Sequence, residues 1–473
     1  MTSLDPPKTR GLKLTNVLTD VKGEWQGPFV GDLTFPGVSV DSRTIKPGEL
    51  FVAIKGPNFD GNDFVIPALK AGAGAVIAER GDLALKPAIL VKDGLKALGD
   101  LALGVRRRAS FKVLAITGSL GKTTVKEMVK NILAAPGGPA PYREILATQG
   151  NLNNEVGLPL TILSIVNNPL PPLEAVLEMG AAAPGDISYL TKIALPDVGL
   201  ITALGPAHLE FFGDIKTIAK TKAELIHGLA PGAIAVVNKG DPLIVAELKE
   251  KAARAFYYGQ KGEVWLKARK DLGIEGQKII FGGPALANLE VKLKLLGEGN
   301  ALNAVAAAAG ALAFGRGRAE IKAGLSQMEP VTGRLKPTKS RWGYVVLDDS
   351  YNASPNSVKA ALKVLASLPG PGVKGAILGD MLELGPQGKE YHREVGHIVA
   401  SMGLDFLGVV GKFSRYMESG ARAAIKPRFA LRVFPNPEEA AAWAKGLMGD
   451  KGYVLVKGSR AVGLERAVAK LLS

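Results

Sequence analysis

The strongest chemical signal in the chain is a glycine-rich turn that ends in lysine and threonine. It runs from Thr117 to Thr124 and reads Thr-Gly-Ser-Leu-Gly-Lys-Thr-Thr. Glycines let a backbone approach an oxyanion closely, and the amides at a helix N-terminus carry partial positive charge. In a phosphate-binding loop, Lys122 reaches the β- and γ-phosphates of a nucleotide and the Thr123 hydroxyl ligates Mg²⁺. Ile116 stands where the full motif has its first glycine. The loop is therefore a shortened variant, and a chance Gly-Lys-Thr turn is the alternative.

Two further candidates stand near the ends of expected strands. Glu178 comes at the end of the apolar run 175–179, and His208 follows the run 198–202. A carboxylate beside a triphosphate would hold Mg²⁺, and a histidine can ligate a metal. The chain has only four histidines. The alternative for both residues is a purely structural role.

Lys222 lies on the apolar face of an expected helix. Over Ile218–Leu229, helical spacing places Ile218, Leu225 and Ile226 on the same face as Lys222. A buried ammonium is costly, so the pKa of the amine falls. A neutral amine can react with CO₂ to form a carbamate, which is an anionic oxygen ligand for Mg²⁺. The alternative is a lysine whose stem covers apolar surface while its ammonium stays in water.

The elements that must position these residues are those of a parallel sheet. Phe111–Thr117 is a continuous apolar run, typical of a strand covered on both faces. After the loop, apolar residues recur at helical spacing, at Val125, Met128, Val129, Ile132 and Leu133. Further buried strands are expected at 175–179, 198–202 and 233–237. In such sheets the ligand binds outside the carboxyl ends of the strands.

At about 150 residues per domain, a chain of 473 residues predicts about three domains. Residues 1–108 hold short apolar runs typical of a small α/β domain, and residues 109–330 hold the phosphate loop. Residues 331–473 hold expected strands at 345–347, 376–378, 407–410 and 454–456, which indicate a second doubly wound domain. We predict an α/β protein with an N-terminal α/β domain, a central P-loop-type parallel-sheet ATPase domain and a C-terminal Rossmann-like domain.

Composition and charge narrow the function. Cysteine is absent, which excludes disulfides, zinc–thiolate sites and cysteine nucleophiles. The net charge of +15 suits nucleic acid, a membrane surface or anionic small substrates. Basic residues form no long run and aromatic residues make up only 6%, which disfavours nucleic acid. Because no segment is apolar enough to direct export or span a bilayer, we expect a cytoplasmic protein without a membrane span.

Taken together, these residues resemble the Mur ligases, the ATP-dependent amide-forming enzymes of peptidoglycan synthesis. The resemblance covers nearly the whole chain. It is carried by motifs that occur in the family's sequence order in all three regions: Asp41-Ser42-Arg43, Asp60-Gly61, the loop 117–124, the stretch 148–159, Glu178-Met179-Gly180, 205–208, Lys222, Gly333-Arg334, 348–353, 378–385 and 457–460.

The resemblance implies roles for individual residues. ATP would be held by Gly118, Ser119, Gly121, Lys122, Thr123, Thr124, Asn300, Arg334, Asp349 and Asn352. Two Mg²⁺ ions would be held by Thr123, Glu178, His208 and a carbamylated Lys222. Catalysis would depend on Lys122, His208, Lys222 and Arg334. The UDP-muramoyl substrate would contact the first domain and the central domain through Ser42, Arg43, Thr148, Asn151 and Asn154.

Within the family, the motifs imply the branch that joins D-alanyl-D-alanine to a UDP-muramoyl-tripeptide, acting as a monomer. The branch that adds the third residue usually carries Asp-Asn-Pro-Arg, whereas this chain has only Pro435-Asn436-Pro437-Glu438. A folylpolyglutamate synthetase would leave the first domain unexplained. The alternative of another class is a basic P-loop ATPase that binds nucleic acid.

Overall fold

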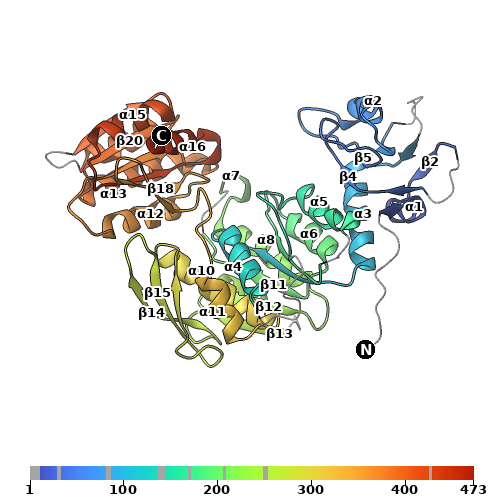
Figure 1. Ribbon diagram of the computed structural model, residues 1–473, viewed down its shortest axis with the longest axis horizontal. Helices are drawn as coiled ribbons and strands as arrows, with labels where there is room; N and C mark the ends of the chain where they lie inside the picture. Colours follow the sequence, from blue (N-terminus) through green and yellow to red (C-terminus); the bar gives the residue numbers. More distant parts are fainter. Residues whose placement is uncertain are drawn as a thin grey trace.

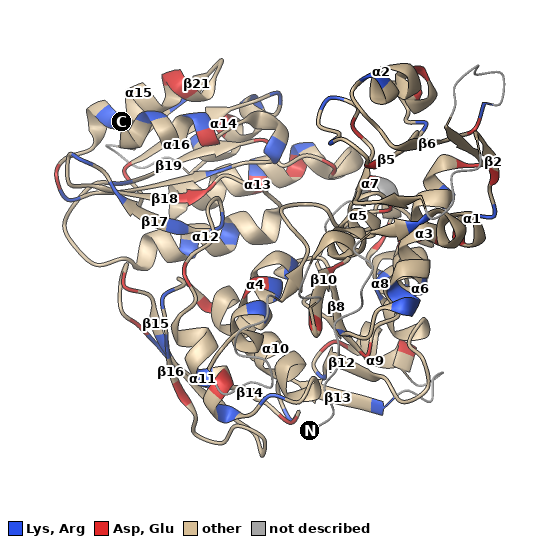
Figure 2. Ribbon diagram, turned by 45° about the vertical axis from the view of Figure 1, so that its right-hand side comes forward, with Lys and Arg blue, Asp and Glu red and all other residues tan. Residues whose placement is uncertain are grey.

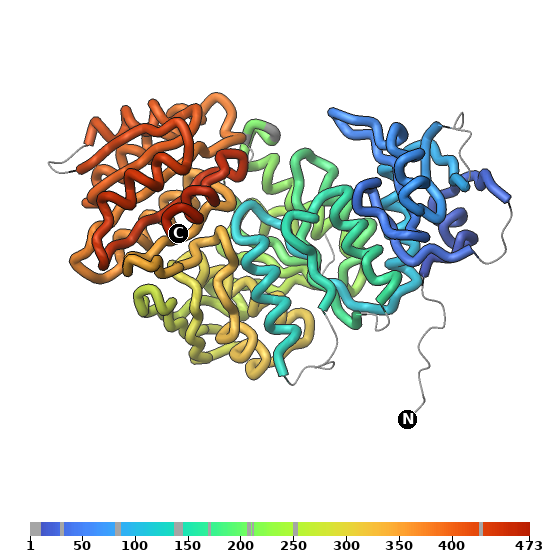
Figure 3. The backbone as a smooth tube through the Cα atoms, turned by 45° about the horizontal axis from the view of Figure 1, so that its top comes forward, coloured from blue at the N-terminus to red at the C-terminus, as the bar shows by residue number. Residues whose placement is uncertain are grey.

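The computed structural model describes residues 11–28, 33–80, 87–136, 145–168, 172–205, 209–248, 254–424 and 429–473. The chain forms three parts in sequence order, with the N-terminal and C-terminal parts at opposite ends and the central part between them (Figures 1 and 3). The site of interest therefore depends on how the outer parts meet the central one.

The N-terminal part is built on a five-stranded sheet of order β2-β7-β6-β5-β4. All neighbours are parallel except the edge strand β2, which pairs antiparallel with β7. The predicted apolar runs form its central strands. The elements are β1 (Leu12–Lys13), α1 (Leu14–Val21), β2 (Glu24–Gln26), β3 (Thr34–Phe35), β4 (Val38–Ser39), β5 (Leu50–Val52), α2 (Val65–Lys70), β6 (Ala75–Ala78), β7 (Ala88–Leu90) and α3 (Gly94–Arg108).

Helix α3 joins this part to the central one. Its buried face packs on α1 and also on α5 (Gly157–Leu163) and α6 (Asp186–Ala194) of the central part. At Gly99 a Cβ atom would lie 2.1 Å from the hydroxyl of Tyr189 on α6, so the contact needs glycine. The Arg106 guanidinium donates to the carbonyls of Ala194 and Leu195 at 2.7 and 3.1 Å. These contacts fix the end of α3 against the central part.

The central part carries a six-stranded, all-parallel sheet of order β13-β12-β11-β8-β10-β9. Strand β8, the first of these strands in the chain, lies between β10 and β11, so connections leave it in both directions. That reversal opens a crevice at its carboxyl end. The strands are β8 (Lys112–Thr117), β9 (Leu146–Ala147), β10 (Glu174–Glu178), β11 (Val198–Ile201), β12 (Ile234–Asn238) and β13 (Arg254–Tyr258). The predicted buried strands of this region are confirmed.

Helices cover both faces of the central sheet. They are α4 (Lys122–Leu133), α5 (Gly157–Leu163), α6 (Asp186–Ala194), α7 (Leu209–Phe212), α8 (Ile215–His227), α9 (Pro242–Leu248), α10 (Glu298–Ala313) and α11 (Arg318–Ser326). The alanine-rich α10 is buried along most of its length against α4 and the sheet. Its small side chains let neighbouring elements approach closely on several sides.

A small antiparallel sheet beside α10 was not predicted. Its order is β14-β15-β16, with β14 (Trp265–Asp271), β15 (Gln277–Gly282) and β16 (Glu290–Leu293). Its apolar residues alternate with charged ones. In β15 the buried Ile279 follows Lys278, and in β16 the buried Val291 follows Glu290. Such strands have one solvated face and lack a continuous apolar run.

The C-terminal part is a second doubly wound sheet, of order β17-β18-β22-β19-β20-β21. All pairs are parallel except the antiparallel edge strand β17. The elements are β17 (Lys336–Lys339), β18 (Val345–Asp349), α12 (Pro355–Ser367), β19 (Lys374–Gly379), α13 (Gly388–Ser401), β20 (Phe406–Val410), α14 (Ser414–Arg422), β21 (Ala430–Phe434), α15 (Pro437–Leu447), β22 (Tyr453–Lys457) and α16 (Glu465–Leu472). The predicted three-part α/β fold is confirmed.

Lysine and arginine are spread over all three parts among acidic residues (Figure 2). In the part of the chain that the structure describes, no helix is long and apolar enough to cross a membrane.

Candidate active site

The phosphate loop lies where β8 ends and α4 begins. Gly118 and Gly121 have φ values of +141° and +82°. A Cβ atom at Gly118 would lie 2.0 Å from Thr202 Oγ1, and one at Gly121 would lie 2.2 Å from Asn303 Oδ1. Only glycine satisfies both the backbone conformation and the space. The amide of Leu120 also donates to the carbonyl of Ala203 at 3.1 Å, which ties the loop to the end of β11.

Lys122 is the first residue of α4 and closes the loop on itself. Its Nζ donates to the carbonyl of Gly118 at 3.0 Å. Burial lowers the pKa of Lys122, the positive charge of Arg334 lowers it further, and the carboxylate of Glu178 opposes the change. The ammonium therefore shares one small volume with a carboxylate and a guanidinium.

Two buried polar atoms at this site have no hydrogen-bond partner among the described residues: Ser119 Oγ and Glu178 Oε2. Glu178 is only 2% exposed, and its other carboxylate oxygen accepts from Asn153 Nδ2 at 2.8 Å. Its amide donates to Thr148 Oγ1 at 2.9 Å, which holds the end of β10 in place. An unpaired buried hydroxyl and an unpaired buried carboxylate oxygen are costly unless a ligand satisfies them.

These donors fit a magnesium–phosphate ligand. The carboxylate of Glu178 and the hydroxyl of Thr123 are hard oxygen donors, and Ser119 offers a hydrogen bond to a phosphate oxygen. Among the described residues, no three His, Asp or Glu side chains cluster as a ready-made metal cage. Mg²⁺ in nucleotide sites is commonly bound by one or two protein oxygens together with substrate phosphates.

Lys222 lies on α8, which begins after the N-cap Asp214. The residue is 3% exposed, and its Nζ lies 5.6 Å from the ring centroid of Phe212. Burial, helped by the charge of Lys122, lowers the pKa of Lys222 to about 7, against the opposing charges of Asp186 and Glu224. The alternative of an ammonium held in water is therefore wrong, and the helical spacing identified the buried face correctly.

Arg334 reaches the phosphate loop from the C-terminal part. Its Nη2 donates to Thr123 Oγ1 at 2.8 Å, and its guanidinium lies 4.5 Å from the ring centroid of Tyr351. The preceding Gly333 has φ +75°, and its amide donates to Asp348 Oδ2 at 3.0 Å. The segment before β17, bonded to Asp348 of β18 and packed on Tyr351, thus aims a charged side chain of the C-terminal part at the loop of the central part.

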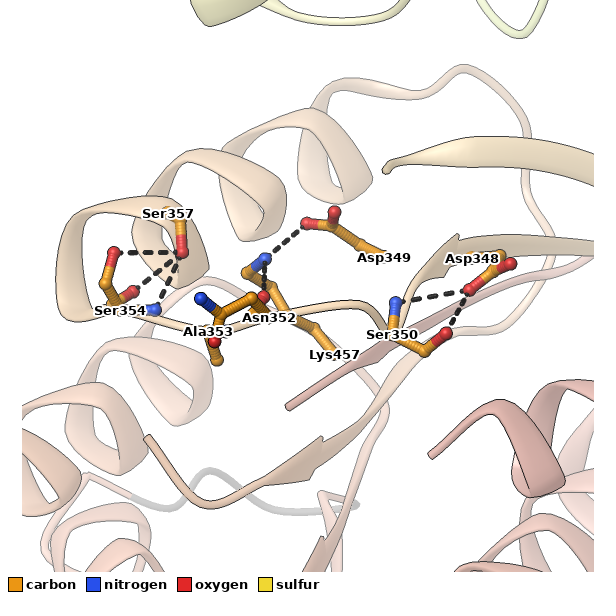
Figure 4. A network of polar contacts seen from close by, with 8 residues as sticks. All are labelled: Asp348, Asp349, Ser350, Asn352, Ala353, Ser354, Ser357 and Lys457. Atoms are coloured by element: carbon orange, nitrogen blue, oxygen red, sulfur yellow. Dashed lines mark hydrogen bonds and ion pairs between the residues drawn. The ribbon is translucent and has the colours of Figure 1, made fainter. Parts of the chain in front are cut away.

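Asp349 is the last residue of β18, and Asn352 lies in the segment that follows it (Figure 4). Lys457 Nζ, from β22, lies 2.7 Å from Asp349 Oδ2 and donates to the carbonyl of Asn352 at 2.8 Å. Burial raises the pKa of Asp349, and the charge of Lys457 opposes that rise. The side chain of Asn352 accepts from the amide of Ala353 at 2.8 Å. Lys457 therefore holds both predicted residues in one rigid turn.

Asn300 lies in the first turn of α10. Its Nδ2 donates to the carbonyl of Leu296 at 2.8 Å, and its Oδ1 accepts from Asn303 Nδ2 at 3.2 Å. Since Asn303 Oδ1 fills the space beside Gly121, Asn300 is linked to the phosphate loop through one intervening side chain.

The residues predicted to hold the second substrate lie in two places. Thr148 is buried beside Glu178, and Lys126 Nζ donates to its carbonyl at 2.6 Å. Asn154 Oδ1 accepts at 2.9 Å from the amide of Gly157, the first residue of α5. The carbonyl of Asn151, between them in the chain, accepts from the amide of Asn153 at 2.8 Å.

Ser42 and Arg43 lie in the turn after β4, a strand that contacts α5. The Arg43 side chain is 85% exposed and pairs with Asp41 at 2.7 Å, which lowers the pKa of Asp41 to about 2. This turn belongs to the N-terminal part rather than to the cluster around the phosphate loop. His208 lies outside the described residues.

Four contributors were given no role from the sequence: Lys126, Asn153, Tyr351 and Lys457. The last three lie within the motifs that carry the family resemblance. Lys126 had a usable signal, because it lies on the apolar stripe of α4 as Lys222 does on α8. The other three act through contacts between segments that are distant in the sequence.

The fold and the site together define a class of protein. A phosphate loop on a parallel sheet, completed by an arginine from a following doubly wound domain, is typical of a nucleotide-dependent enzyme that works between domains.

Three family models match the chain in order: the Mur ligase family catalytic domain over residues 34–106, the Mur ligase middle domain over 116–311 and the Mur ligase glutamate ligase domain over 333–460. The chain belongs to the Mur ligase family.

Individual relatives agree in length and order. The UDP-N-acetylmuramoyl-tripeptide--D-alanyl-D-alanine ligase of Escherichia coli K12 is 35% identical, over 96% of this chain and 97% of its own. The crystal structure of MurF from Acinetobacter baumannii is similar with a TM-score of 0.88 at 30% identity, over 98% of this chain and 100% of that one. The MurF ligase of Thermotoga maritima, solved in complex with ADP, has a TM-score of 0.81 at 32% identity, over 93% and 98% of the two chains.

Proposed function

We propose that the protein uses ATP to join D-alanyl-D-alanine to UDP-N-acetylmuramoyl-tripeptide, in the synthesis of the peptidoglycan precursor. The observation that carries this proposal is the bond from Arg334 to Thr123, which brings the C-terminal part onto the phosphate loop beside the unpaired oxygen of Glu178. The relatives supply the substrates, since the Escherichia coli ligase of that name matches nearly end to end.

The chemistry follows from the poor reactivity of a carboxylate. The terminal carboxylate of the tripeptide attacks the γ-phosphorus of ATP, ADP leaves, and an acyl phosphate results. The free amine of the dipeptide then attacks the acyl carbon, phosphate leaves, and the amine loses a proton. Negative charge spreads over the phosphoryl oxygens in the first step, so catalysis is mainly positioning and electrostatic stabilisation. Lys122 and Arg334 supply fixed positive charge for it.

Magnesium bound here would neutralise phosphate charge and help to orient the nucleotide. Thr123, Glu178, His208 and a carbamylated Lys222 are the proposed ligands for two ions. Removal of the Lys222 positive charge would also relieve its repulsion with Lys122.

The three predicted regions divide the remaining work. Residues 1–108 bind the uridine nucleotide substrate through Ser42 and Arg43, and residues 109–330 bind ATP and the muramoyl peptide, the latter through Thr148, Asn151 and Asn154. Residues 331–473 contribute Arg334, with Asp349 near the ribose and Asn352 near the phosphates. Asn300 contacts the nucleotide from α10. The dipeptide binds between the central and C-terminal parts. We propose a cytoplasmic monomer that does not bind nucleic acid.

Closure between these parts also protects the reaction. An acyl phosphate hydrolyses if water reaches it, so the amine must arrive in a site from which water is excluded. Arg334 and Tyr351, whose side chains pack on each other at this junction, both belong to the C-terminal part.

The test is a product assay with the purified protein, ATP, Mg²⁺, UDP-N-acetylmuramoyl-tripeptide and a set of dipeptides, followed by mass analysis. We expect one product, heavier by D-alanyl-D-alanine less water, and ADP in equal amount. Lys122→Ala should abolish turnover and weaken ADP binding in calorimetry. ADP release stimulated by nucleic acid instead of by the two peptides would contradict the proposal.

The acyl phosphate is tested separately. With ¹⁸O in the β–γ bridge of ATP, the tripeptide alone should promote scrambling of the label into non-bridging positions. If ATP is consumed in the presence of the tripeptide without scrambling and without a trappable acyl intermediate, the two-step chemistry is wrong.

A further inference from the structure

A partly buried loop of the C-terminal part lies at the carboxyl end of β19. It follows β19 and comprises residues 380–384, here named the β19 loop. The two oxygens of the Asp380 carboxylate accept from the amides of Lys412 and Phe413 at 2.7 and 3.0 Å. Ser459 donates its amide to the carbonyl of Asp380, and its Oγ accepts from the amide of Leu382, both at 2.9 Å. The loop is therefore bonded to the segments after β20 and β22.

Another amide of this stretch, that of Met381, donates to a histidine side chain. His392 lies on α13 and is fully buried. Its Nε2 accepts from the Met381 amide at 3.0 Å, and its Nδ1 lies 2.6 Å from the carbonyl of Gly388. Because a carbonyl can only accept, Nδ1 carries the proton; because an amide can only donate, Nε2 carries the lone pair. Both contacts therefore require the neutral ring in one tautomer.

The far end of the β19 loop touches the central part. Glu383 has φ +64°, a conformation that side-chain-bearing residues seldom adopt, and its carbonyl accepts from the amide of Glu210 at 3.3 Å. Glu210 lies on α7, and Phe212 of the same helix covers Lys222. The loop thus links the bonded pair His392–Met381 to the wall of the candidate active site.

We propose that His392 is a positioning residue of the ligase: its neutral imidazole holds the β19 loop against α7, and protonation of Nε2 releases the loop. A proton on Nε2 would set one N–H against the N–H of Met381, so this bond cannot persist. The proposal rests on the function proposed above for its substrate effects, because the dipeptide is placed between the two parts that this loop joins.

The surroundings of the ring favour the neutral state. The charged group that faces His392 from the β19 loop is Asp380. The ring of Phe413, in the segment after β20, stacks on His392 with 4.7 Å between the ring centroids. Beyond Phe413 lies Tyr416 of α14, which is covered by Lys389 and Arg393 of α13. Burial lowers the pKa of His392, and the Gly388 carbonyl and Asp380 oppose that change. The bond is therefore intact at neutral pH, and its loss requires a pH below the ordinary histidine pKa.

Two non-titrating variants separate the two contacts. In His392→Gln, the side-chain oxygen can take the place of Nε2 as acceptor for Met381. In His392→Asn, the shorter amide can reach only the Gly388 carbonyl. The matched control is His397→Gln on the exposed side of the same helix. Steady-state kinetics for ATP and D-alanyl-D-alanine, measured between pH 5 and 9, are combined with hydrogen exchange of residues 380–384 in the whole protein.

We expect His392→Asn to raise KM for the dipeptide about tenfold, the effect of leaving one buried amide unpaired, with KM for ATP unchanged. His392→Gln should stay within about twofold of wild type at pH 8 and lose the fall in dipeptide affinity at acid pH. Exchange of the Met381 amide should accelerate on acidification, relative to the intrinsic rate, in the wild type and in His397→Gln but not in His392→Gln. In His392→Asn it should be fast at every pH, while β20 amides keep wild-type protection and report an intact fold.

Equal behaviour of the Gln and Asn variants would overturn the proposal, as would Met381 exchange in the wild type that does not respond to pH. The exchange experiment needs no substrate. If wild type and His397→Gln fail to ligate the dipeptide, the proposed function is wrong, and the exchange data still decide what His392 does.

Discussion

The proposed carbamate on Lys222 requires a neutral amine, and the neutral fraction of that amine can be calculated. Carbamate formation joins a neutral amine to CO₂ and releases one proton, so the yield follows the neutral fraction. With a pKa of about 7, about nine-tenths of the Lys222 side chain is neutral at pH 8 before CO₂ adds. An ordinary lysine is neutral in about 0.3% of molecules at that pH. Lys222 should therefore offer roughly 300 times more reactive amine than a surface lysine.

The assay is ¹³C NMR of the purified protein in ¹³C-bicarbonate. We expect a carbamate resonance at pH 8 that is lost in Lys222→Met and retained in Lys220→Met, a control at an exposed position of the same helix. Lowering the pH protonates the amine, so the signal should fall as the pH drops through about 7. Lys222→Ala should lose activity and regain part of it with acetate or formate, which restore an anionic oxygen near the same place.

Two results would refute this reasoning. A wild-type spectrum without a carbamate resonance at pH 8, or an equal resonance in Lys222→Met, would show that burial does not make this amine the reactive one. If no small carboxylate restores the activity of Lys222→Ala, the role of Lys222 as a magnesium ligand is contradicted. The NMR experiment decides separately whether the carbamate forms.

Three further substitutions test the site and its support. Arg334→Lys keeps the charge but loses the planar group stacked on Tyr351. We expect kcat to fall about a hundredfold with KM for ATP little changed. An unchanged kcat would exclude a role of Arg334 in the transition state. Glu178→Gln should raise the Mg²⁺ concentration needed for half-maximal activity more than about tenfold, and an unaltered Mg²⁺ titration would remove Glu178 from the ligand set. Glu174→Ala leaves the buried Arg316 guanidinium without its carboxylate and should destabilise the central part by about 3–5 kcal/mol in denaturant unfolding. The double variant Glu174→Leu, Arg316→Met should recover most of that loss of stability. A Glu174→Ala variant as stable as wild type would contradict the expected destabilisation.

Much of the central part could be predicted because burial on both faces leaves a direct mark in the sequence. Strands β8, β10 and β11 are continuous apolar runs, and a polar or glycine residue at each carboxyl end marks the edge where a ligand binds. Lys222 was found for the complementary reason, since a charged residue on an otherwise apolar helix face conflicts with the local pattern.

The rest depended on contacts that no local pattern encodes. The sheet β14–β16 escaped because its exposed face carries charge at alternate positions. Thr123 and Arg334 are 211 residues apart, and Asn153 meets Glu178 only because the loop after β9 passes the end of β10. Neither Asn153 nor Tyr351 has a residue type or spacing that would indicate its partner. The sequence therefore located the phosphate loop and the buried Glu178 and Lys222, while the side chains that contact them required the structure.

The bond between Arg334 and Thr123 indicates how nucleotide binding would rearrange the site. A guanidinium binds a phosphate oxygen more strongly than a neutral hydroxyl, because both partners are then charged and two parallel bonds can form. When a triphosphate enters the loop, Arg334 should therefore leave Thr123 Oγ1 for the phosphate, and the freed hydroxyl oxygen becomes available as a cation ligand. The Tyr351 ring, 4.5 Å from the guanidinium, would support the guanidinium during this exchange. The bond between Arg334 and Thr123 thus joins two groups that a nucleotide would use separately, so nucleotide binding is coupled to the contact between the central and C-terminal parts.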